Sequence, residues 1–146
     1  MIKMKRVTLL LVCIMGIILM FTACGKDNRN GLDVTLMNNT TEEIVGVAVS
    51  PAEEGKFTDN LLADGVVFAP KGNQKIVVAE DKAKAKDKYD LKIIFENGRE
   101  ALIRNIDFKD IDDGEIAADS EQVYLTYKSL SSKKEVSISS NSSIAG

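Results

Sequence analysis

The feature that most constrains the fold of this chain is a pair of strand-like runs joined by an Asn-Gly step. Every second residue from Tyr89 to Phe95 is apolar, and this period of two is typical of a strand with one buried face. A second such run spans 99–108. Asn97-Gly98 between them is the strongest short-range signal for a β-hairpin, because both positions of a two-residue turn need positive φ. The sequence therefore predicts a hairpin over 89–108.

A two-residue turn would also fix the register of this hairpin. Three pairs would face each other as compatible neighbours: Glu96 with Arg99, Ile93 with Leu102, and Tyr89 with Ile106. The same register would place Arg104 opposite Leu91 and Glu100 opposite Phe95, with both charges on the apolar face. We therefore expect that these side chains reach solvent at the rim of the sheet or that the strand carries a bulge.

Other short apolar segments extend the same pattern, and none has the period of an amphipathic helix. The remaining predicted strands are 32–37, 44–50, 66–68, 74–79 and 121–128, with 136–138 as a weak edge strand. About seven short strands at near-regular spacing predict an all-β fold. The predicted architecture is an antiparallel β-sandwich, Ig-like or C2-like in outline, with a small β-barrel as the alternative.

Three connections in this scheme are polar. In the loop 51–60 and just after it, Phe57 and Leu61-Leu62 are expected to hold the chain against the core. The segment 107–119 is read as a second loop, and these two loops are where we expect contacts with partners. Lysines at 82, 84, 86 and 88 could form a basic docking strip. Acidic neighbours favour a solvated loop or a lysine-protected edge strand instead.

The N-terminus has the pattern of an export signal. Residues 1–6 are basic and residues 7–23 form an uncharged apolar run, which predicts a signal helix. A transmembrane helix is the alternative, since about 17 residues is the lower limit for spanning a bilayer. Residues 24–31 then read as a flexible tether, 32–128 as the β-sandwich, and 129–146 as a Ser-rich tail that is disordered or adds the weak edge strand.

Phe21-Thr22-Ala23-Cys24 resembles the lipobox of bacterial lipoproteins. The resemblance implies that residues 1–23 are removed and that Cys24 carries a thioether-linked diacylglycerol. The protein would then lie on the extracytoplasmic face of the cell membrane, or on the outer membrane if the source has two membranes. Cys13 would be lost with the signal, so no disulfide would form. The tether of about seven residues would span about 15 Å as a random coil.

The predicted domain also resembles a small all-β domain of uncharacterised bacterial exported proteins. The shared landmarks are Asn38 with Thr40, Ser50-Pro51, Asn60-Leu61-Leu62, Tyr89-Asp90-Leu91, Asn97-Gly98 and Asn105-Ile106-Asp107. This resemblance implies a fold and brings no activity with it.

Composition restricts the chemistry. The chain has no His and no Trp, which excludes imidazole catalysis and argues against a sugar-binding cleft with aromatic platforms. Its formal charge is −3, but the signal holds three of the 19 basic residues and none of the 22 acidic ones. The remainder therefore carries about −6, which argues against nucleic-acid partners.

Two carboxylate groupings are the remaining candidates for chemistry. An acidic stretch could supply oxygen ligands to Ca²⁺, although its spacing does not match the helix-loop-helix calcium pattern; its members are Asp107, Asp110, Asp112, Asp113 and Glu115. Asp59 and Asp64 could form the carboxylate pair of a small hydrolase. We expect neither a resident cofactor nor catalysis. The sequence is best read as a lipid-anchored binding or accessory module for an extracytoplasmic protein or envelope polymer, with a calcium-dependent module as the alternative.

Overall fold

The structure is a computed structural model that describes residues 31–140. Within that range the chain forms eight strands and one 3₁₀ turn, so the predicted all-β class is confirmed. The elements are β1 (Leu32–Asn38), β2 (Ile44–Pro51), β3 (Asn73–Ala79), β4 (Tyr89–Phe95), β5 (Glu100–Ile106), η1 (Phe108–Asp110), β6 (Asp113–Ala118), β7 (Val123–Lys128) and β8 (Glu135–Ser139). The predicted signal helix and most of the predicted tether lie outside the described residues.

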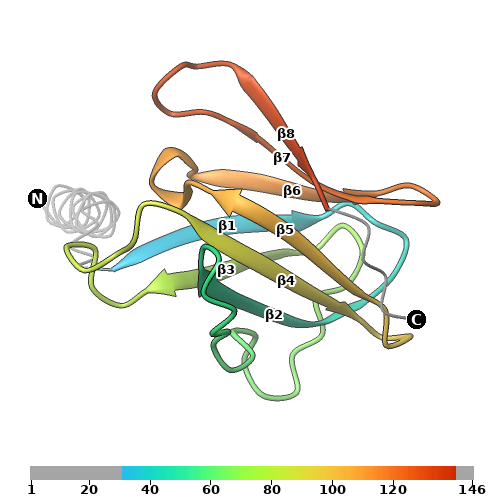
Figure 1. Cartoon of the computed structure of the whole chain (residues 1–146). Coiled ribbons are helices and arrows are strands. Elements are labelled where there is room, and N and C mark those ends of the chain that lie inside the picture. Colours follow the sequence, from blue (N-terminus) through green and yellow to red (C-terminus); the bar gives the residue numbers. More distant parts are fainter. Residues whose placement is uncertain (1–30, 141–146) are drawn as a thin grey trace, which may run out of the picture.

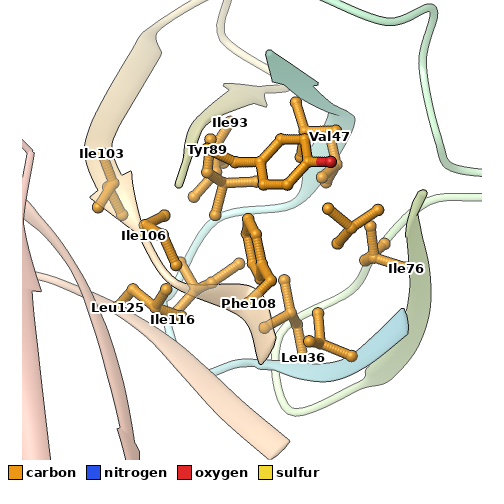
Figure 2. Close-up of a cluster of buried hydrophobic side chains, with 14 of the residues drawn as sticks. Leu36, Val47, Ile76, Tyr89, Ile93, Ile103, Ile106, Phe108, Ile116 and Leu125 are labelled. Atoms are coloured by element: carbon orange, nitrogen blue, oxygen red, sulfur yellow. The ribbon is translucent and has the colours of Figure 1, made fainter. Parts of the chain in front are cut away.

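The strands form two sheets that share one core, as in a sandwich (Figure 1). One sheet has five strands in the order β3-β1-β6-β7-β8, and the other has three in the order β2-β4-β5. The sheets do not close into a barrel, so the barrel alternative is wrong. Figure 2 shows side chains from both sheets meeting in the core, with Leu36 and Leu125 from the larger sheet and Ile93 and Ile103 from the smaller.

Strand β6 corrects two predictions. Its residues were expected to belong to a polar loop over 107–119, and the sheets were expected to be wholly antiparallel. Instead β6 lies in the middle of the larger sheet, where it pairs parallel with β1 and antiparallel with β7. The alternation of β6 is weak because Ile116 is its only large apolar side chain. Gly114 faces the core, where an added Cβ would lie 3.0 Å from Leu36 Cδ2 and 3.1 Å from Leu125 Cδ1.

The predicted hairpin is present as β4–β5, but its two-residue turn is wrong. Phe95 pairs with Arg99 (N···O 2.9 Å), which leaves a three-residue loop. Only Gly98 in this loop has positive φ, at 86°. The loop has the form of a turn followed by a residue in the left-handed region, the next most common hairpin connection. The register therefore moves by one residue, and Ile93 pairs with Ala101 instead of Leu102.

With this register, neither of the two charged side chains of β5 lies on the apolar face. Ala101 and Ile103 now face the core, and Glu100 and Arg104 are exposed. Near the other end of the hairpin, Tyr89 pairs with Ile106 as predicted, so β5 must hold one extra residue between the two registers. The predicted bulge is therefore confirmed, with Asn105 at φ 59°. Arg99 forms an ion pair with Glu42 (Nη2···Oε2 3.0 Å) instead of the predicted pair with Glu96.

The outer edge of β2 is covered by the connection that follows it. Asn60 accepts a hydrogen bond from Val47 N (3.0 Å) and donates one to Val45 O (2.9 Å). Thr58 Oγ1 accepts a hydrogen bond from Val49 N, and the backbone N–H of Thr58 donates one to Val49 O. Side chains and backbone of residues 58–61 thus occupy the positions that a further strand would take, and they bond to Val45, Val47 and Val49 along this edge.

The same connection confirms one expectation and corrects another. Leu62 is buried and Leu61 packs against the core, as expected, whereas Phe57 lies half-buried with Lys92 Nζ 4.6 Å from its ring centre. The predicted strand 66–68 is wrong, because it forms only one bridge, between Phe68 and Ile44. The lysine-rich stretch 80–88 is a loop rather than an edge strand. The predicted edge strand 136–138 is confirmed as the centre of β8.

Candidate functional site

The structure distributes the five predicted calcium ligands over separate local contacts. Asp107 caps η1 by accepting from Lys109 N (3.1 Å). Glu115 lies on β6, where its carboxylate accepts from Asn39 Nδ2. Asp112 and Asp113 are exposed at the start of β6. Within residues 31–140 no three carboxylates converge as a metal-binding group. Calcium binding stays a prediction from the sequence.

Asp110 has a structural role that the sequence did not reveal. Its carboxylate accepts from Ser129 Oγ (2.6 Å) and Ser131 N (2.7 Å), and its backbone oxygen accepts from Leu130 N. These hydrogen bonds, that of Ser129 first, lower the pKa of Asp110 below the ordinary 3.8. Asp110 therefore fixes the turn between β7 and β8 onto η1.

The predicted hydrolase pair lies at the surface. Asp59 and Asp64 are both exposed, on the connection that covers the edge of β2. Catalysis by this pair stays a hypothesis from the sequence.

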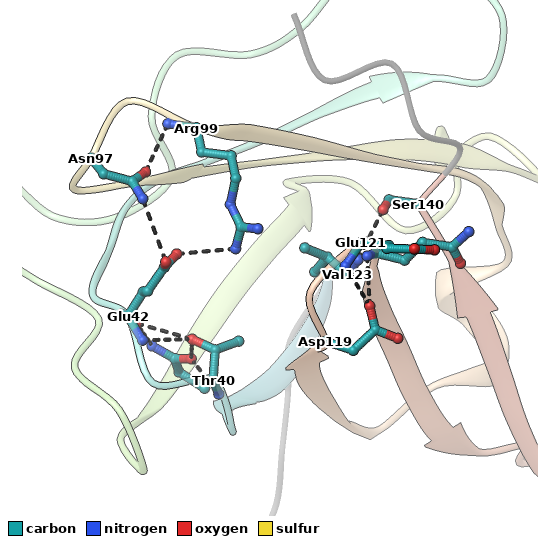
Figure 3. A network of polar contacts seen from close by, with 10 residues as sticks. Thr40, Glu42, Asn97, Arg99, Asp119, Glu121, Val123 and Ser140 are labelled. Carbon is teal, nitrogen blue, oxygen red and sulfur yellow. Dashed lines mark hydrogen bonds and ion pairs between the residues drawn. The ribbon is translucent and has the colours of Figure 1, made fainter. Parts of the chain in front are cut away.

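Most polar landmarks of the predicted domain stabilise turns and edges. Asn38 is fully buried at the end of β1; it donates to Phe68 O (2.8 Å) and accepts from Thr40 N (3.0 Å). Figure 3 shows Thr40 of this network bonded to Glu42, whose carboxylate in turn contacts both Asn97 and Arg99. These side chains are committed to backbone and side-chain partners within the fold, so the candidate contact surface lies elsewhere.

The described surface carries a shallow groove of about 370 Å³ on the outward face of the five-stranded sheet. We call this the sheet-face groove. Its lining comes from β1, β6, β7 and β8 and the start of β3: Thr35, Met37, Asn73, Asp113, Gly114, Glu115, Thr126, Tyr127, Lys128 and Glu135. The register places several of these in contact, with Thr35 opposite Asp113 and Glu115 opposite both Met37 and Thr126.

The charged side chains of the sheet-face groove have an acidic bias. Asp113, Glu115 and Glu135 contribute three carboxylates, and Lys128 contributes the one ammonium group among the lining residues. Lys128 pairs across the strands with Glu135, which partly offsets that carboxylate. The groove is therefore suited to a polar partner that presents positive or amide groups.

Sequence reasoning missed this surface because it placed the functional residues in loops. Asp113 and Glu115 were identified, but as ligands in a loop instead of outward residues of a central strand. The usable signal was the outward-facing half of each alternating run, such as Thr35 and Met37 in the first strand. Which of two sheet faces is hollowed depends on strand order, and the short β6 was not predicted.

Cys24, the predicted lipid anchor, lies outside the described residues. Among residues 31–140 there is no helix long and apolar enough to cross a membrane. Comparisons with protein-family models, curated proteins and solved structures found no match.

Proposed function

We propose that this protein is a lipid-anchored, non-catalytic module that binds an extracytoplasmic protein or envelope polymer through the sheet-face groove. The observation that carries the binding part is the groove itself. Its outward-facing side chains include three carboxylates, whereas the buried polar residues hold turns and edges together. The anchor rests on the lipobox-like sequence before Cys24.

The anchor is tested by Cys24→Ser. We expect this variant to leave the membrane fraction or to remain unprocessed, because the residue that would carry the acyl chains is gone. Cys13→Ser is the matched control, since the removed signal should not need its thiol. A Cys24→Ser protein that stays in the membrane as a processed, lipid-labelled species would refute the anchor.

The binding surface is tested by site-specific photocrosslinking in intact cells. A photoreactive residue in place of Thr126, whose side chain lines the groove, should give a defined adduct. The control site is Glu96, which is exposed in the β4–β5 turn. Adding Asp113→Lys should lower the Thr126 adduct yield, because it reverses one charge of the groove. Equal yields at both sites, unaffected by this change, would rule out the groove.

For the fold, we propose a variant of the Ig-like or C2-like outline. Two sheets of five and three strands with one shared core support it. The parallel pair β1–β6 is the departure from a wholly antiparallel sandwich. Backbone contacts measured by NMR between Leu36 and Gly114 would test this pairing directly.

A further inference from the structure

The two sides of the sandwich differ in how their edge strands are covered. On the side of β2, residues 58–61 bond to the strand edge, and Leu62 and Phe68 of the same connection enter the core. On the other side β5 lies near β7 and β8, and β8 ends the five-stranded sheet. Within residues 31–140 no other segment bonds to the outer edge of β8.

The pairing of β8 with β7 determines which backbone groups face outward. Lys134 O accepts from Ser129 N (2.9 Å), and Ser140 N donates to Val123 O (2.7 Å). In an antiparallel ladder alternate residues bond to the same neighbour, so the even-numbered residues of β8 bond to β7. The N–H and C=O groups of Glu135, Ser137 and Ser139 therefore point away from the sheet.

We propose that this edge pairs antiparallel with β8 of a second copy of the chain, with Ser137 opposite Ser137. This register pairs all five residues of the strand. It places Glu135 opposite Ser139 of the second copy and Val136 opposite Ile138. The two five-stranded sheets become one continuous sheet across the two-fold axis.

Charge and burial both support a second copy as the occupant. The antiparallel register brings no like charges face to face, whereas a parallel one would set Glu135 beside its own copy. Val136 and Ile138 are only partly buried against the core, and each would cover the other across the joint. The strand's sequence EVSIS also contains neither Pro nor Lys, two residues that commonly block pairing at an edge.

The expected association is weak. A joint of five residues per strand buries less than the roughly 1,200 Å² of a stable interface, which corresponds to a transient complex. The dimer should therefore dissociate on dilution, and its detection needs a comparison between matched variants.

The first test compares Ser137→Pro with Ser137→Ala in the full chain, purified in detergent and followed by sedimentation over a dilution series. Both variants lose the hydroxyl contact with Thr126 Oγ1 (3.1 Å), but only Pro removes the outward N–H. We expect the Ala variant to approach doubled mass at high concentration and the Pro variant to stay monomeric. A monomeric Ala variant, or equal association of the two, would overturn the proposal.

The second test does not depend on the fold of the Pro variant. In a full chain with Cys13→Ser and Cys24→Ser, Ser137→Cys leaves one thiol on the two-fold axis. Hydrogen-bonded partners in an antiparallel ladder have Cα atoms about 5.5 Å apart, within the range of a disulfide. We expect oxidation to give a disulfide-linked dimer much faster than for Ser120→Cys, which is exposed in the β6–β7 turn. Equal rates would refute the pairing.

Discussion

Asp90 is a buried carboxylate whose partners are mainly backbone groups. It is 2% exposed, and its two oxygens accept from Glu53 N (3.2 Å) and Asn105 N (3.1 Å). Glu53 and Asn105 both have positive φ, a backbone conformation that residues other than Gly rarely adopt. One side chain therefore stabilises two strained positions, the start of the loop after β2 and the bulge in β5.

Asp90→Ala should lower the free energy of unfolding by about 2 kcal/mol, because two part-buried backbone N–H groups would lose their acceptor. Denaturant unfolding of the purified protein measures this. Arg104→Ala is the control: its Nη1 lies 3.7 Å from Asp90, but the side chain is half-exposed, so a loss of less than about 1 kcal/mol is expected. Equal losses in the two variants would contradict the backbone role of Asp90.

The low pKa of Asp110 makes the β7–β8 turn sensitive to acid. Hydrogen bonds, first that of Ser129, stabilise the charged form and lower the folded-state pKa below 3.8. Their contribution is fully present above the unfolded value and is lost as pH falls through the folded one. Asp110→Asn should therefore destabilise the protein at neutral pH. Between pH 5 and about 3 the stability of the variant should depend less on pH than that of the parent protein. Parallel pH series of thermal melting would show this; identical slopes would contradict it.

At the scale of elements, the chain's alternating runs predicted most strands, while the exact connections depended on residues distant in sequence. Asn97-Gly98 correctly placed the hairpin turn, but the extra loop residue could not be read from it. The register is determined where Ala101 and Ile103 pack into the core, and the bulge at Asn105 then restores Ile106 to the same face. Burial of the apolar side chains outweighed the preferred geometry of the turn.

The side chain of Asn60 bonds to the edge of β2 in the way that a neighbouring strand would. Asn60→Ala should cost about 1 kcal/mol through the loss of its bonds to Val47 N and Val45 O. Asn60→Asp keeps the acceptor and should recover part of this stability. Neighbouring Asp59→Ala, at an exposed position, should change it little. Denaturant unfolding with hydrogen exchange of Val47 N–H tests all three, and unchanged exchange in Asn60→Ala would contradict the role.

At the scale of the whole molecule, the acidic stretch is divided between structural contacts and exposed side chains. Asp107, Asp110 and Glu115 already have protein donors. We therefore expect the same melting temperature with excess calcium and with chelator, since a ligand that binds only the folded state would raise it. A clear rise with calcium would favour the alternative, the calcium-dependent module, over the module that needs no metal.

The two-sheet architecture followed from strand count and spacing, but the strand order did not. Local alternation carries no information about which distant strands become neighbours. Ile116 alone gave too weak a pattern to reveal β6, and without β6 the hollowed sheet face could not be located. The candidate site was therefore the part of the molecule least accessible from the sequence.

The parallel pairing of β1 with β6 also governs the order in which the molecule can assemble. β1 lies between β3 and β6, and the partner on one side is made some 75 residues later. Until that segment emerges, the inner strand of the larger sheet has an unsatisfied flank, and closing so long a loop slows folding. During synthesis, β1 therefore has an unpaired edge that could aggregate with other chains. This is the stage at which chaperones would be most needed.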